Sequence, residues 1–144
     1  MMLEAGNKLL LFDCGWGAPL NILHAGFDIQ KIDHILISHP HADHMGSLIN
    51  ILQSIFVSGI FYPKTKRVKS LYLHGYFGFK KDLETLIKIM SPELKIVELP
   101  FKIKAFEYQE NQRTIDNLKI SGQEVKHFSD EFHSIAFRVE YLKK

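Results

Sequence analysis

The sequence predicts a layered α/β fold formed by a single domain over residues 1–144. Strand-like apolar runs alternate with helix-type apolar periodicity early in the chain, and strand patterns dominate later. A chain of this length buries a proper core, and its single cysteine, Cys14, excludes a framework of internal disulfides. We therefore expect sheets with helices packed outside them.

The first half of the chain carries three clear elements. A short apolar strand is predicted over residues 8–12, closed by a turn rich in glycine. An early proline and a following glycine predict a short helix over 19–25. Residues 32–38 are nearly continuously apolar, which is typical of a strand covered on both faces.

Two amphipathic helices and a series of strands are predicted further along. Apolar residues recur at helical spacing over 48–56 and again over 79–90, with a strand at 68–73 between them. The remaining predicted strands lie at 95–99, within 103–109, at 118–121, at 124–126 and at 134–142. In the last of these strands apolar and polar residues alternate, so one face should be buried.

Composition excludes few function classes. Hydrophobic residues make up 46% and charged residues 24% of the chain, as in soluble globular proteins. The small net charge of +2 does not indicate a polyanionic partner. The basic run at 64–69 could contact a phosphate backbone, although a solvated turn is the better reading. We find no signal peptide and no run approaching transmembrane length, and therefore expect a cytoplasmic protein without a membrane partner.

Three histidines and one aspartate directly follow the apolar strand at 32–38: His39, His41, Asp43 and His44. Neutral imidazole nitrogen and carboxylate oxygen are groups that zinc accepts. His39 and His41 are one residue apart, so on an extended segment they point to the same side and can share a metal. Asp43 and His44 lie where the chain turns into the next helix and aim elsewhere. The alternative is an exposed polar turn.

This segment resembles the HxHxDH signature of the metallo-β-lactamase superfamily of metal-dependent hydrolases. Its flanks are also similar: residues 9–15 resemble the family's strand ending in Asp-x-Gly, and 32–39 resemble the strand leading into the metal motif. Weaker similarity at 71–75, 125–127 and 134–138 favours the RNase Z-like branch. The resemblance implies an αββα sandwich and a zinc-dependent hydrolase.

The resemblance also implies which residues bind metal. His39, His41 and His127 would hold one Zn²⁺, and Asp43 and His44 would hold a second, with Asp43 also acting in catalysis. Zinc with three protein ligands lowers the pKa of a bound water toward about 7, which predicts hydrolysis without choosing between ester, thioester, lactam and phosphodiester.

Histidines other than His127 remain candidates for the third ligand. His133 lies close in sequence and is the alternative. His74, at the end of a predicted strand, either lines the cleft or is a surface residue. His34 is expected at a strand edge, and Asp13 either orients a ligand or caps a turn.

The resemblance is incomplete, since no bridging aspartate or final histidine of the family follows Ser134. We therefore expect the N-terminal portion of the fold, with an incomplete second metal site and one or two zinc ions. The expected substrates are small molecules or phosphodiesters, with RNA as a candidate. The alternative function is a catalytically impaired metal-binding fragment that acts as a homo-oligomer or with a complementing chain. A purely structural module is a third hypothesis.

Overall fold

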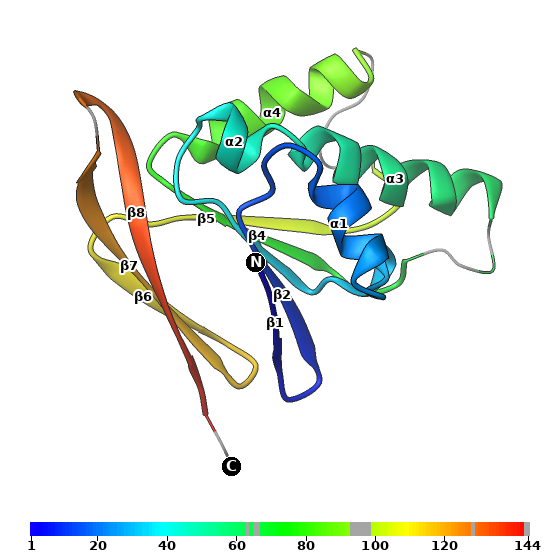
Figure 1. Ribbon diagram of the computed structural model, residues 1–144, viewed down its shortest axis with the longest axis horizontal. Helices are drawn as coiled ribbons and strands as arrows, with labels where there is room; N and C mark the ends of the chain where they lie inside the picture. Colours follow the sequence, from blue (N-terminus) through cyan, green and yellow to red (C-terminus); the bar gives the residue numbers. More distant parts are fainter. Residues whose placement is uncertain (63, 65–66, 93–98, 128, 143–144) are drawn as a thin grey trace.

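The computed structural model describes residues 1–62, 64, 67–92, 99–127 and 129–142. Two sheets form its framework (Figure 1). The five-stranded sheet has the order β1 (Met2–Ala5), β2 (Lys8–Phe12), β3 (His34–Leu36), β4 (Leu71–Gly75), β5 (Ile103–Glu107). The three-stranded antiparallel sheet has the order β6 (Asn111–Ile115), β7 (Leu118–His127), β8 (Ser129–Tyr141).

The helices lie on one side of the five-stranded sheet, and the three-stranded sheet lies on the other (Figure 1). They are α1 (Ala18–His24), the 3-10 turn η1 (Ile29–Lys31), α2 (Ala42–Met45), α3 (Leu48–Phe61) and α4 (Phe79–Met90). Helices α3 and α4 bury the apolar stripes that the sequence predicts. The predicted layered α/β fold is therefore confirmed, and the described residues form three layers, helix, sheet and sheet.

Several predicted boundaries differ from the structure. The predicted strands at 118–121 and 124–126 are one strand, β7, and β8 begins before its predicted start. Strands β1 and β6 were not predicted because they are short, and in β6 the side chains are mostly exposed and polar. The strand predicted at 95–99 lies, apart from Leu99, outside the described residues.

Strands β2, β3 and β4 are parallel, so their carboxyl ends meet at one edge of the sheet. Backbone hydrogen bonds continue this alignment past the strand ends: Asp13 N donates to Leu36 O at 2.8 Å, and Ile37 N donates to His74 O at 2.8 Å. Ligand sites in α/β sheets form at such an edge because the chain leaves each strand there. The histidine motif begins two residues beyond Ile37.

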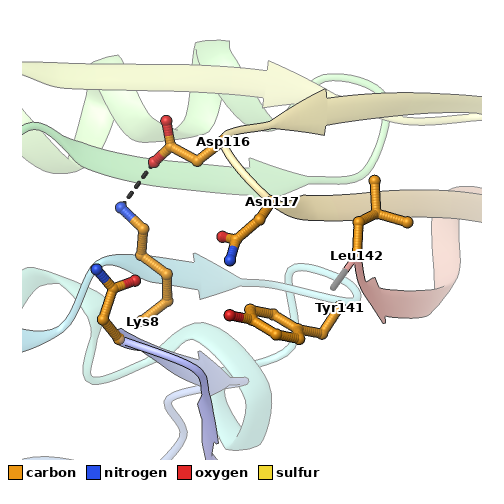
Figure 2. Close-up of a pocket in the computed structure, with 6 residues that line it drawn as sticks. Lys8, Asp116, Asn117, Tyr141 and Leu142 are labelled. Carbon is orange, nitrogen blue, oxygen red and sulfur yellow. Dashed lines mark ion pairs between the residues drawn. The ribbon is translucent and has the colours of Figure 1, made fainter. Parts of the chain in front are cut away.

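At the opposite end of the sheets, two hairpins meet (Figure 2). Lys8, at the start of β2, forms an ion pair with Asp116 of the β6–β7 turn at 2.6 Å. A Cβ on Gly6 would lie 2.4 Å from the Tyr141 hydroxyl, so the β1–β2 turn needs glycine to pack against the end of β8. These contacts close the sandwich on the side away from the motif.

A polar aromatic layer fills the space between the two sheets. His34 Nδ1 lies 3.0 Å from His74 Nε2, and His74 Nδ1 lies 2.9 Å from the Tyr108 hydroxyl. Both histidines are 0% exposed. The expectations of a strand-edge His34 and of a cleft or surface His74 were therefore wrong. Three of their four ring nitrogens have hydrogen-bond partners, whereas His34 Nε2 has none among the described residues.

One helical stretch departs from the expectation that no run approaches transmembrane length. Among the described residues, Ala42–Phe61 is long and apolar enough to cross a membrane by length and composition alone, with a mean hydropathy of 1.3. Its residues Leu48, Ile51 and Ile55 are buried in the core. The stretch is thus part of the folded domain, although only 28% of it is buried.

We predict that acid destabilises this fold through the layer between the sheets. Burial lowers the pKa of His34 to about 4, and burial together with the neighbouring His34 lowers the pKa of His74 to about 3. Below the ordinary value of 6.5 the unfolded chain therefore binds more protons than the folded chain, and stability falls with falling pH. Each of the two histidines should lower the free energy of unfolding by about 2 kcal/mol between pH 7 and pH 5.

Urea midpoints measured across that pH range test this prediction. His24→Gln, which changes an exposed histidine at the end of α1, should leave the pH dependence unchanged. A midpoint that stays constant from pH 7 to pH 5 would contradict the assignment of a neutral buried pair.

Candidate metal centre

His39 and His41 lie between β3 and α2, and Asp43 and His44 lie within α2. His39 is 5% exposed, and its Nε2 lies 3.1 Å from Nδ1 of His41. His41 is the residue that precedes α2, with an extended backbone. The chain bends at Pro40, between the two histidines, and becomes helical at Ala42.

His127 approaches these two histidines from the other sheet. Strand β7 has an irregularity in its pairing with β8 between Val125 and His127, and such bulges redirect a side chain. Ile135 N of β8 donates to Ser38 O at 2.9 Å, which ties the second sheet to the motif. The ring of His127 then lies 4.5 Å from that of His39.

Nitrogen atoms of His39, His41 and His127 all lie within 4.8 Å of one another. Among the described residues, this is the one group of three or more metal-capable side chains whose donor atoms converge. Burial, followed by the neighbouring imidazoles, lowers the pKa of His39 to about 4. His39 is therefore neutral at pH 7, which is the form that binds metal. The donor set fits a zinc ion.

His133, the alternative ligand, lies elsewhere. Its Nδ1 contacts the Glu124 carboxylate, and its ring packs edge-on against Phe77 with centroids 5.1 Å apart. The geometry thus brings His127, and not His133, to the other two histidines, and the assignment of His127 as a metal ligand stays a prediction.

Asp13 and Ser38 connect the motif to the sheet. Asp13 accepts hydrogen bonds from the Ser38 backbone N–H at 2.8 Å and from the Ser38 hydroxyl at 3.1 Å, and lies 2.8 Å from His44 Nδ1. The Ser38 hydroxyl is also 2.9 Å from His39 Nδ1. Carboxylates and hydroxyls behind metal-binding histidines fix the orientation and tautomer of the ring. The sequence suggested this orienting role for Asp13 but not for Ser38. The position of Ser38 directly before His39 could have indicated it.

Asp43 and His44 form a second pair beside the first cluster. Asp43 Oδ2 lies 3.6 Å from His44 Nε2, and the rings of His39 and His44 are 4.0 Å apart. The Asp43 side chain is 62% exposed. Because Asp13 engages His44 Nδ1, the Nε2 atom of His44 faces Asp43. These are two donors, one fewer than a zinc site needs from protein.

The turn after β2 holds α2 in place. Cys14 N donates to His44 O at 2.6 Å, and Ser47 N donates to Cys14 O at 2.8 Å. A Cβ on Gly15 would lie 1.7 Å from Asp43 O, so only glycine allows this contact. Cys14 itself is fully buried, and burial raises the pKa of its thiol, so it serves packing and not metal binding.

A cavity of about 330 Å³ adjoins the Asp43 side of the cluster. Asp13, Gly15, Trp16 and Asp43 contribute to its lining, and the Trp16 side chain is 77% exposed. From the sequence, Trp16 was expected in a turn, and no function was assigned to it. Its exposed ring forms an open apolar wall beside the motif.

This chain is similar in sequence to known ribonucleases. Ribonuclease BN from Escherichia coli O1:K1 is 38% identical over 97 residues, which cover 65% of this chain and 30% of that relative. The chain therefore spans less than a third of the length of the curated relatives it matches first.

Solved structures share the fold. The metallo-β-lactamase fold protein YhfI from Bacillus subtilis matches 96% of this chain and 50% of its own, with a TM-score of 0.70 and 19% identity. The short form of human tRNase Z matches 97% of this chain and 57% of its own, with a TM-score of 0.73 and 19% identity.

The resemblance to the metallo-β-lactamase superfamily and its RNase Z-like branch is therefore confirmed. A family model described as "Anti-Pycsar protein Apyc1" matches residues 1–142. Since the match extends over nearly all of the 144 residues, the chain belongs to the Anti-Pycsar protein Apyc1 family.

Proposed function

We propose that this protein is a zinc-dependent hydrolase that cleaves phosphodiesters. The observation that carries the proposal is the convergence of His39, His41 and His127 nitrogens within 4.8 Å. When bound there, zinc would supply a water of lowered pKa and would polarise a substrate oxygen. Asp43 and His44 are the proposed donors to a second ion.

The chain's own residues define how such a site would work. His39 is neutral, its Nδ1 contacts the Ser38 hydroxyl, and its Nε2 lies 3.1 Å from Nδ1 of His41. Asp13 stabilises His44 in one orientation. Asp43 is exposed beside the cluster and is the carboxylate placed to accept a proton from an attacking water.

Phosphodiesters are the proposed substrate class because the names of two similar proteins, Ribonuclease BN and tRNase Z, describe enzymes that act on RNA. Ribonuclease BN shares 38% identity over 97 residues, and tRNase Z shares the fold. The cavity beside Asp43 accommodates a small substituent, so small phosphodiesters and RNA are both candidate substrates.

A second candidate function is a metal-binding protein with impaired catalysis that works with a second copy or a complementing chain. The pair Asp43 and His44 favours it, because two donors alone hold zinc weakly. On the second sheet Lys119 and Arg138 form ion pairs with Glu140, and Val125 and Tyr141 are each 41% exposed. The edge of β8 that does not pair with β7 is the candidate surface for association.

We predict that His127→Ala removes most of the zinc from purified protein, because the first site would keep only two of its three imidazoles. His133→Ala is the matched control and should retain zinc, since His133 contacts Glu124 and Phe77 instead. Metal analysis after dialysis measures the difference. Equal zinc retention by both variants would remove His127 from the proposed site.

We predict that Asp13→Asn weakens zinc binding by about 10- to 100-fold, because the amide is a poorer acceptor for the groups it orients. Asp116→Asn is a matched control: both aspartates have a positive φ, 51° and 55°, which asparagine also tolerates. Zinc affinities from chelator competition test this. Unchanged affinity in Asp13→Asn, with its melting temperature intact, would show that the carboxylate does not orient the ligands.

We predict weak, zinc-dependent turnover of a bis-aryl phosphodiester by this chain, and a molar mass in solution above the 16.7 kDa of the monomer. Asp43 and His44 have no third donor beside them among the described residues, so a second ion would be held weakly and would contribute little to binding the substrate's oxygens. Turnover with and without zinc, together with light scattering, measures both properties. Fast turnover by a monomer would reject the impaired-fragment alternative, and absent zinc-dependent turnover would reject the hydrolase proposal.

A further inference from the structure

The carboxyl-terminal end of α3 carries an exposed apolar surface that the proposed hydrolase site does not use. Ile60 is 48%, Phe61 is 70%, Tyr62 is 65% and Val68 is 93% exposed. We call these four residues the α3 tip. The buried residues of α3 all lie toward its amino-terminal end, at Leu48, Ile51, Leu52 and Ile55.

A cationic pocket adjoins the α3 tip. It has a volume of about 590 Å³ and shares Tyr62 and Val68 with the tip. Its charged lining residues are Lys31, Arg67, Lys69 and Asp28. Asp28 uses one carboxylate oxygen to cap η1 by accepting from Gln30 N, and a second acid, the buried Asp33, lies 3.6 Å from Lys69 Nζ.

Arg67 is the unusual member of this pocket. Its side chain donates to two neutral backbone carbonyls, Gln30 O at 2.6 Å and Ser70 O at 3.0 Å. The residue is 6% exposed, and its Nε has no hydrogen-bond partner among the described residues. Burying a guanidinium without a directly bound carboxylate is costly, and an anion entering the pocket would offset that cost.

The two lysines lie at the rim of the pocket. Lys69 is 65% exposed, and its Nζ is 3.6 Å from the buried Asp33 carboxylate. Lys31 closes η1 and is exposed. Exposed aromatic and aliphatic residues beside basic residues form the pattern of surfaces that lie in the interface of an anionic membrane.

We propose that the α3 tip docks on an anionic lipid surface, with a lipid phosphate held in the pocket by Lys31, Arg67 and Lys69. An RNA backbone would use the same cations, but bases stack on aromatic rings and gain little from Ile60 and Val68. The apolar half of the surface therefore favours lipid. This proposal revises the sequence-based expectation of no membrane partner, and it does not depend on the metal site.

Flotation of the full chain with vesicles tests the proposal. Vesicles of phosphatidylcholine with about 30 mol% phosphatidylglycerol should bind the protein at low salt, and pure phosphatidylcholine vesicles should not. Lys31→Gln/Lys69→Gln should lower the partition coefficient by about five-fold per lysine. The matched control is Lys80→Gln/Lys81→Gln in the first turn of α4, which should bind like the wild type.

A second pair of variants tests the apolar contribution. Ile60→Ser/Phe61→Ser should abolish flotation, whereas Leu3→Ser/Leu142→Ser, which changes two exposed leucines of the sheets, should not. Equal binding by both pairs, or no binding to anionic vesicles, would overturn the proposal.

Two other occupants are separated in the same experiment. Soluble glycerophosphoglycerol that raises the melting temperature of the wild type, without flotation of the protein, would identify a small-anion site and overturn lipid docking. Binding of a single-stranded RNA that is lost in the lysine variant, again without flotation, would identify a nucleic-acid surface and overturn it likewise.

Discussion

Ser38 is the position on which the two sheets and the histidine motif depend. Its backbone N–H donates to Asp13, its carbonyl accepts from Ile135 of the second sheet, and its hydroxyl contacts His39. One residue thus joins the end of β3, the turn after β2 and strand β8. Because β8 is fixed there, β7 and its terminal His127 are fixed beside the motif as well. The convergence of ligands from two sheets is a consequence of this junction.

Sequence spacing bears most directly on residues that are neighbours in the chain. The His-x-His spacing favours two side chains on one side of an extended segment, and in the structure His39 Nε2 lies 3.1 Å from His41 Nδ1 although the chain bends at Pro40. Asp43 and His44 are consecutive residues of α2, which helical geometry points in different directions, so spacing does not predict their 3.6 Å approach. His127 lies almost ninety residues away, and its selection over His133 depended on a family resemblance. The bulge in β7 and the ion contact of His133 with Glu124 are tertiary features that no spacing encodes.

The layer between the sheets shows where sequence reasoning fails. His34 and His74 occupy strand positions that binary patterning assigns to an edge or a surface, because an imidazole is polar. The structure places both on adjacent parallel strands, where His34 Nδ1 contacts His74 Nε2 and His74 Nδ1 contacts the Tyr108 hydroxyl. His34 Nε2 has no hydrogen-bond partner among the described residues. Contacts between polar groups are a property of pairs, so single-residue propensity misses them.

Helix α3 connects the two surfaces to which a function is proposed here. Its amino-terminal end follows α2, which carries Asp43 and His44, and its carboxyl-terminal end forms the α3 tip. Fourteen helical residues separate these ends by about 21 Å. With α3 standing along the membrane normal, a protein docked through the tip would hold the motif roughly one helix length from the lipid surface, beyond the Debye length of about 8 Å at physiological salt. An anionic phosphodiester would then reach the cluster without strong repulsion from the membrane, so docking and hydrolysis are compatible in one molecule.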